Sequence, residues 1–229
     1  MRYSRQVALI GKQAQNKLSK KTVTILGLGA LGSNIANLLA RAGINLKLID
    51  FDIVDLTNLQ RQALYSEEDI NKPKVIAAKE RLSKINSEIN IQIFNEKLTE
   101  SNLKILNSDL IIDCTDNLTA RFLLNDYCYN KIPWIHTAAI KYTGVVYFIL
   151  PKKPCLKCIY SKNTDIDNCQ ELGVLNTITA LIASIASTQA INFLTNNKTE
   201  ESMIRFNIQE NKLEKIKVTR RCKKCLKLS

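Results

Sequence analysis

Gly27-Leu28-Gly29-Ala30-Leu31-Gly32 is the stretch of this 229-residue chain that decides its fold. The apolar, β-branched run 21–26 comes directly before it, and leucine and isoleucine recur at helical spacing after it, over residues 30–42. A G-x-G-x-x-G turn between a buried strand and a helix lets the backbone approach a phosphate, and the helix N-terminus offers unpaired N–H groups to it. Gly27, Gly29 and Gly32 therefore predict a nucleotide site, and this motif leaves NAD, FAD and ATP open.

Three features further along the chain narrow the choice of nucleotide. Asp50 ends the next strand-like run, where a carboxylate is placed to bind ribose hydroxyls. Residues 57–62 (Thr-Asn-Leu-Gln-Arg-Gln) then supply amides and the Arg61 guanidinium, a group well suited to a polyphosphate. Lys74 adds a charge at a helix start, where the helix dipole does not favour lysine, although most single lysines are simply solvated.

Asp116 and Asn117 follow another apolar run, 110–114. At the edge of a parallel sheet where ligands gather, a carboxylate can hold Mg²⁺ between phosphates. Either side chain can also cap the helix that follows, and the two roles are compatible. No Walker A sequence is present, so the motifs exclude a P-loop NTPase. Together these segments favour cleavage of ATP over reduction of a dinucleotide.

Strands and helices alternate over the first 130 residues. Strands are predicted at 21–26, 46–50, 89–94 and 110–114, and helices at 30–42, 73–86, 99–106 and 118–129. Later segments predict strands at 134–138, 145–150, 203–208 and 213–218, an irregular stretch at 151–173, and a long helix at 176–194. We therefore expect an α/β fold: a Rossmann-like, mostly parallel sheet with flanking helices and antiparallel C-terminal strands.

Four of the seven cysteines fall into two pairs, Cys155-x-x-Cys158 and Cys222-x-x-Cys225. Each pair has the spacing of half a four-thiolate zinc site. Four unrelated buried thiols or redox dithiols are the alternatives. We interpret the zinc as structural, because four thiolates leave no position for a substrate. The metal would pin the chain end in a single domain, 1–229, with the nucleotide-binding part at about 1–150 and the remainder at about 151–229.

The composition is that of an ordinary soluble protein, with a net charge of +12. The excess lysine either solvates the surface or attracts an acidic partner or polyanion; since the lysines are spread along the chain, a nucleic-acid interface is not expected. The apolar run Gly144–Leu150 is too short to span a bilayer, and residues 1–6 lack the apolar core of a signal peptide. We expect no membrane association and a cytoplasmic, or equivalent reducing, location.

In this order and spacing, the segments resemble the ThiF/MoeB/HesA family, the ubiquitin-activating-enzyme-like adenylating enzymes. The matching segments are Arg2-Tyr3-Ser4-Arg5-Gln6, Gly27 to Gly32, Asp50-Phe51-Asp52, Asn58 to Gln62, Lys72-Pro73-Lys74, Asp113 to Asn117 and the two cysteine pairs. The resemblance implies adenylation of the C-terminal Gly-Gly carboxylate of a ubiquitin-fold sulfur-carrier protein, with release of pyrophosphate. It also implies a homodimer, and it suggests a sulfur-donor enzyme as a further partner.

The resemblance further implies roles for individual residues. The nucleotide would be held by Gly27, Gly29, Ala30, Gly32, Asp50, Asp52, Asn58, Arg61, Gln62, Lys74, Asp116 and Asn117. Asp50 would hold ribose, Asn58 and Arg61 the phosphates, Lys74 would neutralise the displaced phosphates, and Asp116 would bind Mg²⁺. Arg5 would reach the ATP of the neighbouring subunit. Ala30 stands where the family often has glycine, and alanine is small enough for the backbone contact to survive.

Cys169 lies in a polar loop and is the cysteine expected to be exposed, whereas Cys114 is expected to be buried in a strand and Cys128 to lie on a helix. Similar family members place a reactive cysteine in this loop, where it can take the activated carboxylate as a thioester or acyl-persulfide. Nothing in the local sequence indicates a lowered pKa, so reactive and passive roles for Cys169 stay open. His136, the only histidine, is interpreted as structural.

Two other classes of protein compete with a carrier-adenylating enzyme. An NAD(P)-dependent oxidoreductase would explain Gly27 to Gly32 and Asp50. It leaves Arg61, Lys74, Asp116 and the cysteine pairs without a use. A catalytically silent scaffold of the same fold is disfavoured, because the charged positions are intact. The motifs do not distinguish a thiamine-pathway carrier from a molybdopterin-pathway one.

Overall fold

A computed structural model describes residues 2–160, 172–196 and 198–226 of the chain. Its centre is an eight-stranded sheet of order β3-β2-β1-β4-β5-β6-β7-β8. The strands are β1 Thr22–Leu26, β2 Asn45–Ile49, β3 Ile91–Phe94, β4 Leu110–Asp113, β5 Trp134–Ile140, β6 Thr143–Ile149, β7 Met203–Asn207 and β8 Lys212–Ile216. The pairs from β3 to β5 are parallel and those from β5 to β8 antiparallel, which confirms the expected fold class.

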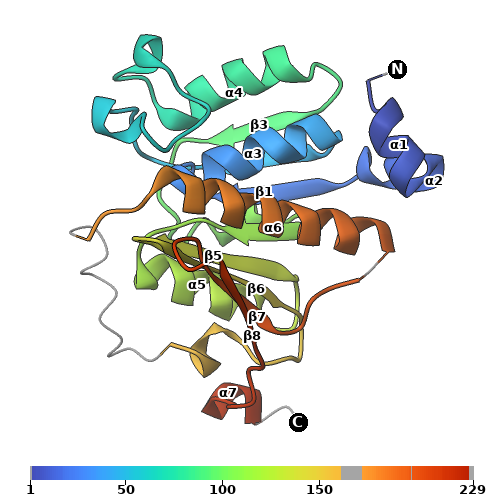
Figure 1. The fold of residues 1–229 in the computed structure, drawn as a ribbon, viewed down its shortest axis with the longest axis vertical. Helices are drawn as coiled ribbons and strands as arrows, with labels where there is room; N and C mark the ends of the chain where they lie inside the picture. Colours follow the sequence, from blue (N-terminus) through green and yellow to red (C-terminus); the bar gives the residue numbers. More distant parts are fainter. Residues whose placement is uncertain (1, 161–171, 197, 227–229) are drawn as a thin grey trace.

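Helices cover both faces of this sheet, as Figure 1 shows with α3 and α6 in front and α5 behind. The helices are α1 Ser4–Ile10, α2 Lys12–Leu18, α3 Ala30–Ala42, α4 Lys74–Ile85, α5 Leu118–Cys128, α6 Asn176–Asn196 and α7 Lys223–Leu226. Single 3₁₀ turns lie at Leu56–Asn58, Glu67–Asp69, Leu103–Leu106 and Leu156–Cys158. The layered arrangement follows from the strand–helix alternation, because each crossover helix must pack back onto the sheet.

Alternate residues of the central strands build two separate cores. On β4, Leu110 and Ile112 join the cluster under α3 and α6, whereas Ile111 joins the cluster under α5. All four residues of β4 are buried, as expected for a strand covered on both faces. The two cores fix the carboxyl ends of β1, β2 and β4 along one edge of the sheet, where the predicted nucleotide segments begin.

Some expectations about local structure were wrong. The segment 99–106 forms only the 3₁₀ turn Leu103–Leu106, and Asn102 Oδ1 instead accepts the Thr99 N–H at 2.8 Å in the loop before that turn. The sequence did not predict α1 and α2, and α1 has no buried residue that could give it an apolar period. Cys114 lies one residue beyond β4 and is half-buried, not buried within the strand.

The long helix α6 is apolar along most of its length. By length and composition it could cross a membrane, with a mean hydropathy of 1.4 in its most apolar window. Half of that window is buried inside the protein, and α6 packs against α3, β5 and β6. This packing is that of a core helix.

Candidate functional site

The glycine turn after β1 is sterically restricted to glycine at two positions. Gly27 has a φ of 89°, and a Cβ there would lie 2.8 Å from the carbonyl oxygen of Cys114. A Cβ on Gly32 would lie 1.9 Å from the carbonyl oxygen of Gly27. The first glycine therefore lets β1 and the end of β4 approach each other, and the second lets α3 begin directly beside the turn.

Within the described part of the chain, the start of α3 has no side-chain cap. Gly29 is its N-cap and, among the described residues, no side chain accepts a hydrogen bond from the first turn. A Cβ on Gly29 would meet only the Gln62 amide, at 3.8 Å, so the backbone is accessible. Ala30, the first residue of this 13-residue helix, fits the turn without distorting it. The N–H groups and the positive end of the helix dipole suit a phosphate.

Asp50 packs directly behind this turn. Its carboxylate accepts hydrogen bonds from the N–H groups of Leu28 and, at 2.8 Å, of Asp52. Burial raises the pKa of Asp50 above its ordinary value, and these two hydrogen bonds oppose the rise. The residue thus sits beyond the end of β2, beside the glycine turn, where the sequence predicts a ribose-binding carboxylate.

Lys74 is not a solvated lysine. Its side chain is only 6% exposed, and Nζ lies 2.9 Å from Oδ2 of Asp52, whose carboxylate is half-exposed. The Lys74 N–H also donates to the carbonyl of Asp52 at 2.9 Å, so the first turn of α4 is tied to the end of β2. A buried ammonium needs a charged partner, and here that partner is a half-exposed carboxylate three residues beyond β2.

The segment 57–62 packs against the start of α3. Arg61 Nη1 donates to the carbonyl of Thr57 at 2.9 Å, and Gln62 Nε2 donates to Oδ1 of Asn58 at 2.8 Å. Asn34 of α3 donates to the carbonyls of both Ala30 and Arg61. Gln62 is buried, and its Oε1 has no hydrogen-bond partner among the described residues. An orphaned buried acceptor beside a bare helix start is a position that a bound nucleotide can satisfy.

Asp116 and Asn117 follow β4 on the neighbouring strand end. Asn117 Oδ1 accepts the Ala120 N–H at 2.8 Å and caps α5, which confirms the capping role for that residue. Asp116 is exposed at the same edge. Since β1 pairs with β4 in register up to Leu26 and Asp113, the Asp116 turn lies beside the glycine turn. Because Mg²⁺ is commonly bound through one or two carboxylates together with phosphate oxygens, the Asp116 carboxylate is a ligand type that suits this ion.

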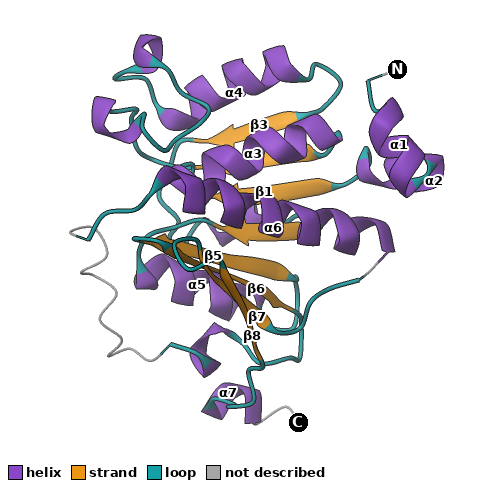
Figure 2. Ribbon diagram, in the orientation of Figure 1, coloured by secondary structure: helices purple, strands orange, loops and turns teal. Residues whose placement is uncertain are grey.

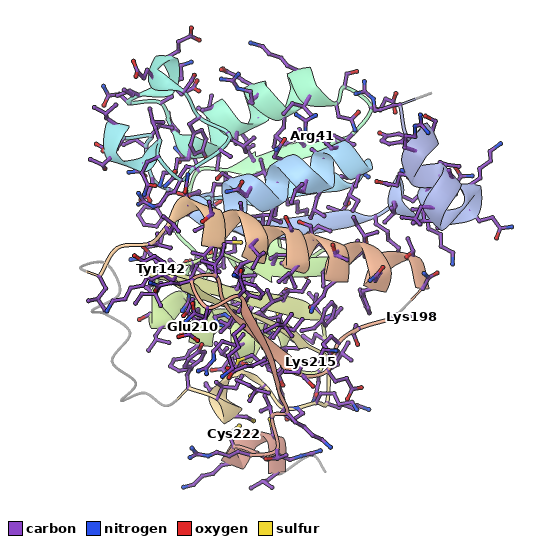
Figure 3. The ribbon with its side chains drawn as sticks, viewed as in Figure 1. Arg41, Tyr142, Lys198, Glu210, Lys215 and Cys222 are labelled. Carbon is purple, nitrogen blue, oxygen red and sulfur yellow. The ribbon has the colours of Figure 1, made fainter. Side chains whose placement is uncertain are left out.

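The four cysteines of the two pairs converge, and one of them, Cys225, belongs to α7. Their Sγ atoms all lie within 4.8 Å of one another, with Cys155–Cys222 and Cys158–Cys225 each at 3.7 Å. A zinc ion with Zn–S bonds of about 2.3 Å requires tetrahedral S···S separations of about 3.8 Å. The cluster therefore fits zinc, and Cys222, labelled in Figure 3, joins the chain end to the loop that follows β6.

The structure does not bring Arg5 to the glycine turn of its own chain. Arg5 lies on α1, which packs at the opposite end of α3 (Figure 2): Gln6 Nε2 donates to the carbonyl of Ala42 at 3.1 Å. A helix of 13 residues spans about 20 Å, so Arg5 is far from Gly29. Cys169 lies outside the described residues.

The remaining predicted residues occupy structural positions. His136 is fully buried within β5, with Nδ1 2.8 Å from Oδ2 of Asp113, and Cys128 is buried on α5. Asp113 also pairs with Arg121 of α5, a buried arginine that no sequence pattern singled out, because a lone arginine on an amphipathic helix gives no periodic signal. A separate groove of about 290 Å³ lies at the amino ends of β1 and β2, away from these groups, and is lined mainly by amides and hydroxyls.

A glycine turn at a bare helix start, flanked by carboxylates beyond adjacent parallel strands, defines a Rossmann-like nucleotide-binding protein. More particularly, the chain belongs to the ThiF family, whose match covers residues 3–227.

Individual relatives agree with this family. The chain is 35% identical over 214 residues to the sulfur carrier protein ThiS adenylyltransferase of Escherichia coli K12, covering 90% of this chain and 85% of the relative. It is 40% identical over 202 residues to the molybdopterin-synthase adenylyltransferase of Haemophilus influenzae, covering 83% and 82%. Among solved structures, E. coli MccB with ATP superposes with a TM-score of 0.86 at 26% identity, covering 98% of this chain and 74% of that one.

Proposed function

We propose that the chain is an adenylyltransferase that activates the C-terminal glycine carboxylate of a ubiquitin-fold sulfur-carrier protein, of the ThiS or MoaD type, and releases pyrophosphate. The observation that carries the proposal is that the bare start of α3, the Lys74–Asp52 pair and Asp116 follow the carboxyl ends of three adjacent parallel strands, β1, β2 and β4. Relatives named as adenylyltransferases of ThiS and of molybdopterin synthase support this substrate class.

The chemistry asks for positioning and charge neutralisation. The carrier carboxylate is already a nucleophile, so its attack on the α-phosphate of ATP needs no general base, and the separation of charge dominates the barrier. Asp50 would hold the ribose, the start of α3 with Asn58 and Arg61 the phosphates, and Lys74 the charge that develops on pyrophosphate. Asp116 would hold Mg²⁺, which neutralises phosphate charge when bound.

An NAD(P)-dependent oxidoreductase is the alternative for the same glycine turn, and one assay separates the two. The adenylyltransferase should exchange labelled pyrophosphate into ATP only when a Gly-Gly carrier is present. Binding of NAD(P) with no carrier-dependent exchange would favour the oxidoreductase. Running ThiS-type and MoaD-type carriers in parallel also tells which pathway the chain serves.

The position of Arg5 supports a homodimer in which each active site takes this residue from the partner. Because about 20 Å of α3 separate Arg5 from its own glycine turn, a role in catalysis requires a second copy of the chain. We further propose that residues 1–229 act as one adenylating domain, with carrier binding in the part from about 151 onward. A cytoplasmic location and a sulfur-donor enzyme as later partner complete the proposal.

We propose that the four-cysteine cluster binds one structural zinc ion. Elemental analysis of protein purified without chelator should therefore find about one zinc per chain. Cys222→Ser should lower the zinc content and the melting temperature, because metal binding and ordering of the chain end are coupled. Cys114→Ser, a thiol outside the cluster, is the matched control and should keep its zinc. Metal-free wild-type protein would overturn the assignment.

We propose Cys169 as the residue that accepts the activated carrier. Cys169→Ala should keep pyrophosphate exchange within about threefold of wild type, because adenylation precedes thiol transfer. The same substitution should abolish any thiol-sensitive covalent adduct between enzyme and carrier, as read by intact mass after incubation with ATP. The control is again Cys114→Ser, which should keep the adduct. An adduct that survives in Cys169→Ala would assign it to another group.

A further inference from the structure

The turn that carries Asp116 is held by a cluster of charged side chains in the interior. Asp113 Oδ1 accepts hydrogen bonds from the N–H of Thr115 at 3.1 Å and from its hydroxyl at 2.7 Å. Arg121 Nη2 donates to the carbonyl of the same threonine. All three hydrogen-bonding groups of Thr115, the residue directly before Asp116, are therefore fixed by two buried side chains.

The two side chains are also joined to each other. Arg121 Nε lies 3.5 Å from Asp113 Oδ2, and Nδ1 of His136 lies 2.8 Å from that same oxygen. Asp113 and His136 are 0% exposed and Arg121 is 4% exposed. Burial alone would raise the pKa of Asp113, but the His136 hydrogen bond and the Arg121 charge outweigh it and hold the pKa below its usual range. The carboxylate is therefore ionised, and His136 must donate to it from Nδ1.

This cluster is not expected to add much to the free energy of unfolding. A buried ion pair contributes little compared with well-packed apolar residues, because both charges lose their hydration. Here two further polar atoms, Arg121 Nε and His136 Nε2, are buried without a hydrogen-bond partner in the described part of the chain. What the cluster does supply is a fixed geometry for the Thr115 backbone.

The geometry of the Thr115 backbone decides where Asp116 lies relative to the glycine turn. On one side of the turn, Cys114 packs its carbonyl against Gly27 so closely that a Cβ on the glycine would lie 2.8 Å from it. On the other side, Asn117 caps α5, the helix that carries Arg121. The segment between the glycine turn and α5 is thus anchored at each end, with Asp116 between the anchors.

We propose that Arg121, together with Asp113, is a positioning residue for Asp116: it holds the metal-binding carboxylate in register with the glycine turn, so that Mg²⁺ and ATP bind together. The proposal rests on the assignment of Mg²⁺ to Asp116 in the proposed function. Arg121 is buried and bonds to Asp113 and to the Thr115 carbonyl, so it would act through the Thr115 backbone.

The test is the magnesium dependence of nucleotide binding, measured by calorimetry with a non-cleavable α,β-methylene ATP and no carrier. Arg121→Lys keeps a buried cation beside Asp113 but loses the planar fork that reaches both Asp113 and Thr115. We expect it to raise the Mg²⁺ concentration for half-maximal binding by about 10- to 100-fold, the usual cost of losing a residue that orients a metal ligand. Magnesium-free affinity should stay within about threefold of wild type.

The matched control is Arg81→Lys, the same substitution at a half-exposed arginine on α4 that pairs with Asp69. It should leave the magnesium dependence unchanged. A double mutant supplies the sharpest readout: in an Asp116→Asn background, Arg121→Lys should add less than about a twofold further shift, because the two residues act in series.

Three results would overturn the proposal: an unchanged magnesium dependence in Arg121→Lys, an equal loss of magnesium-free affinity, or an additive shift in the double mutant. If Arg121→Lys does not fold, Thr115→Val is the second variant. It removes one of the three hydrogen bonds of Thr115, that of its hydroxyl, with little change of shape, and it should shift the magnesium dependence in the same direction. Because no carrier is used, failure of carrier-dependent exchange leaves this result standing, whereas an Asp116→Asn variant with normal magnesium dependence would refute both the metal assignment and the positioning role.

Discussion

Asp116→Ala should leave the protein folded and lower carrier-dependent pyrophosphate exchange by about 1,000-fold or more. The residue is exposed at the carboxyl edge of the sheet, so its loss opens no cavity in either core. In the proposed function it is the carboxylate that would hold a cation against the triphosphate, and removing one preorganised electrostatic group from a transition state typically costs about 100- to 1,000-fold. Losing a divalent cation removes more positive charge from the transition state than losing a single hydrogen-bond donor does.

Exchange of labelled pyrophosphate into ATP at saturating carrier measures this effect, and a thermal melt shows whether the variant folds. Asp126→Ala is the matched control, because Asp126 is a partly exposed aspartate on α5 whose recorded ion pair is with Lys157. The control should keep exchange near the wild-type rate. Exchange by Asp116→Ala within a few-fold of wild type would remove Asp116 from the site.

Arg5→Ala and Arg61→Ala should each be inactive alone and active when mixed. If each site combines Arg61 of one subunit with Arg5 of the partner, a mixed dimer contains one intact site and one site that lacks both residues. Random subunit exchange makes about half of the dimers mixed, so about a quarter of the sites, and of the wild-type activity, should return.

The subunits are exchanged by mild dilution and reconcentration. Pyrophosphate exchange into ATP is then measured before and after this treatment. Mixing Arg5→Ala with an Arg5→Ala, Arg61→Ala double mutant is the control, since no combination of these chains restores a site. Recovery only in the first mixture supports a shared site. No recovery in dimers shown by mass to be mixed would contradict the role given to Arg5.

The α/β core could be predicted because local and global signals coincide there. The strand β1, the glycine turn and α3 appear at the predicted residues. A strand buried on both faces of the sheet must be continuously apolar, and the close backbone contacts of the turn require glycine, so both features are visible in the sequence. By contrast, α1 is held by polar contacts such as the Gln6–Ala42 hydrogen bond. Contacts of this kind between distant residues produce no hydrophobic periodicity in the sequence, so they do not predict a helix.

The cysteine cluster was predictable from the sequence, whereas the surroundings of the charged side chains were not. The cysteine spacing predicted the convergence that the Sγ distances show, because a tetrahedral ion imposes both. The burial of Lys74 depends on Asp52, which is 22 residues away, and the place of Arg121 depends on Asp113. These ion pairs join residues that are distant in the sequence and that come together only when the chain folds, so no local sequence pattern predicts them.

The measurement that tests the central claim most directly is the intact mass of a Gly-Gly carrier incubated with the protein, Mg²⁺ and ATP, quenched in acid. Formation of the acyl-adenylate should add one AMP to the carrier, and the product should be absent for a carrier that lacks its final glycine and for Asp116→Ala protein. A carrier of unchanged mass with both ThiS-type and MoaD-type proteins, from enzyme that is folded and binds ATP, would contradict the account.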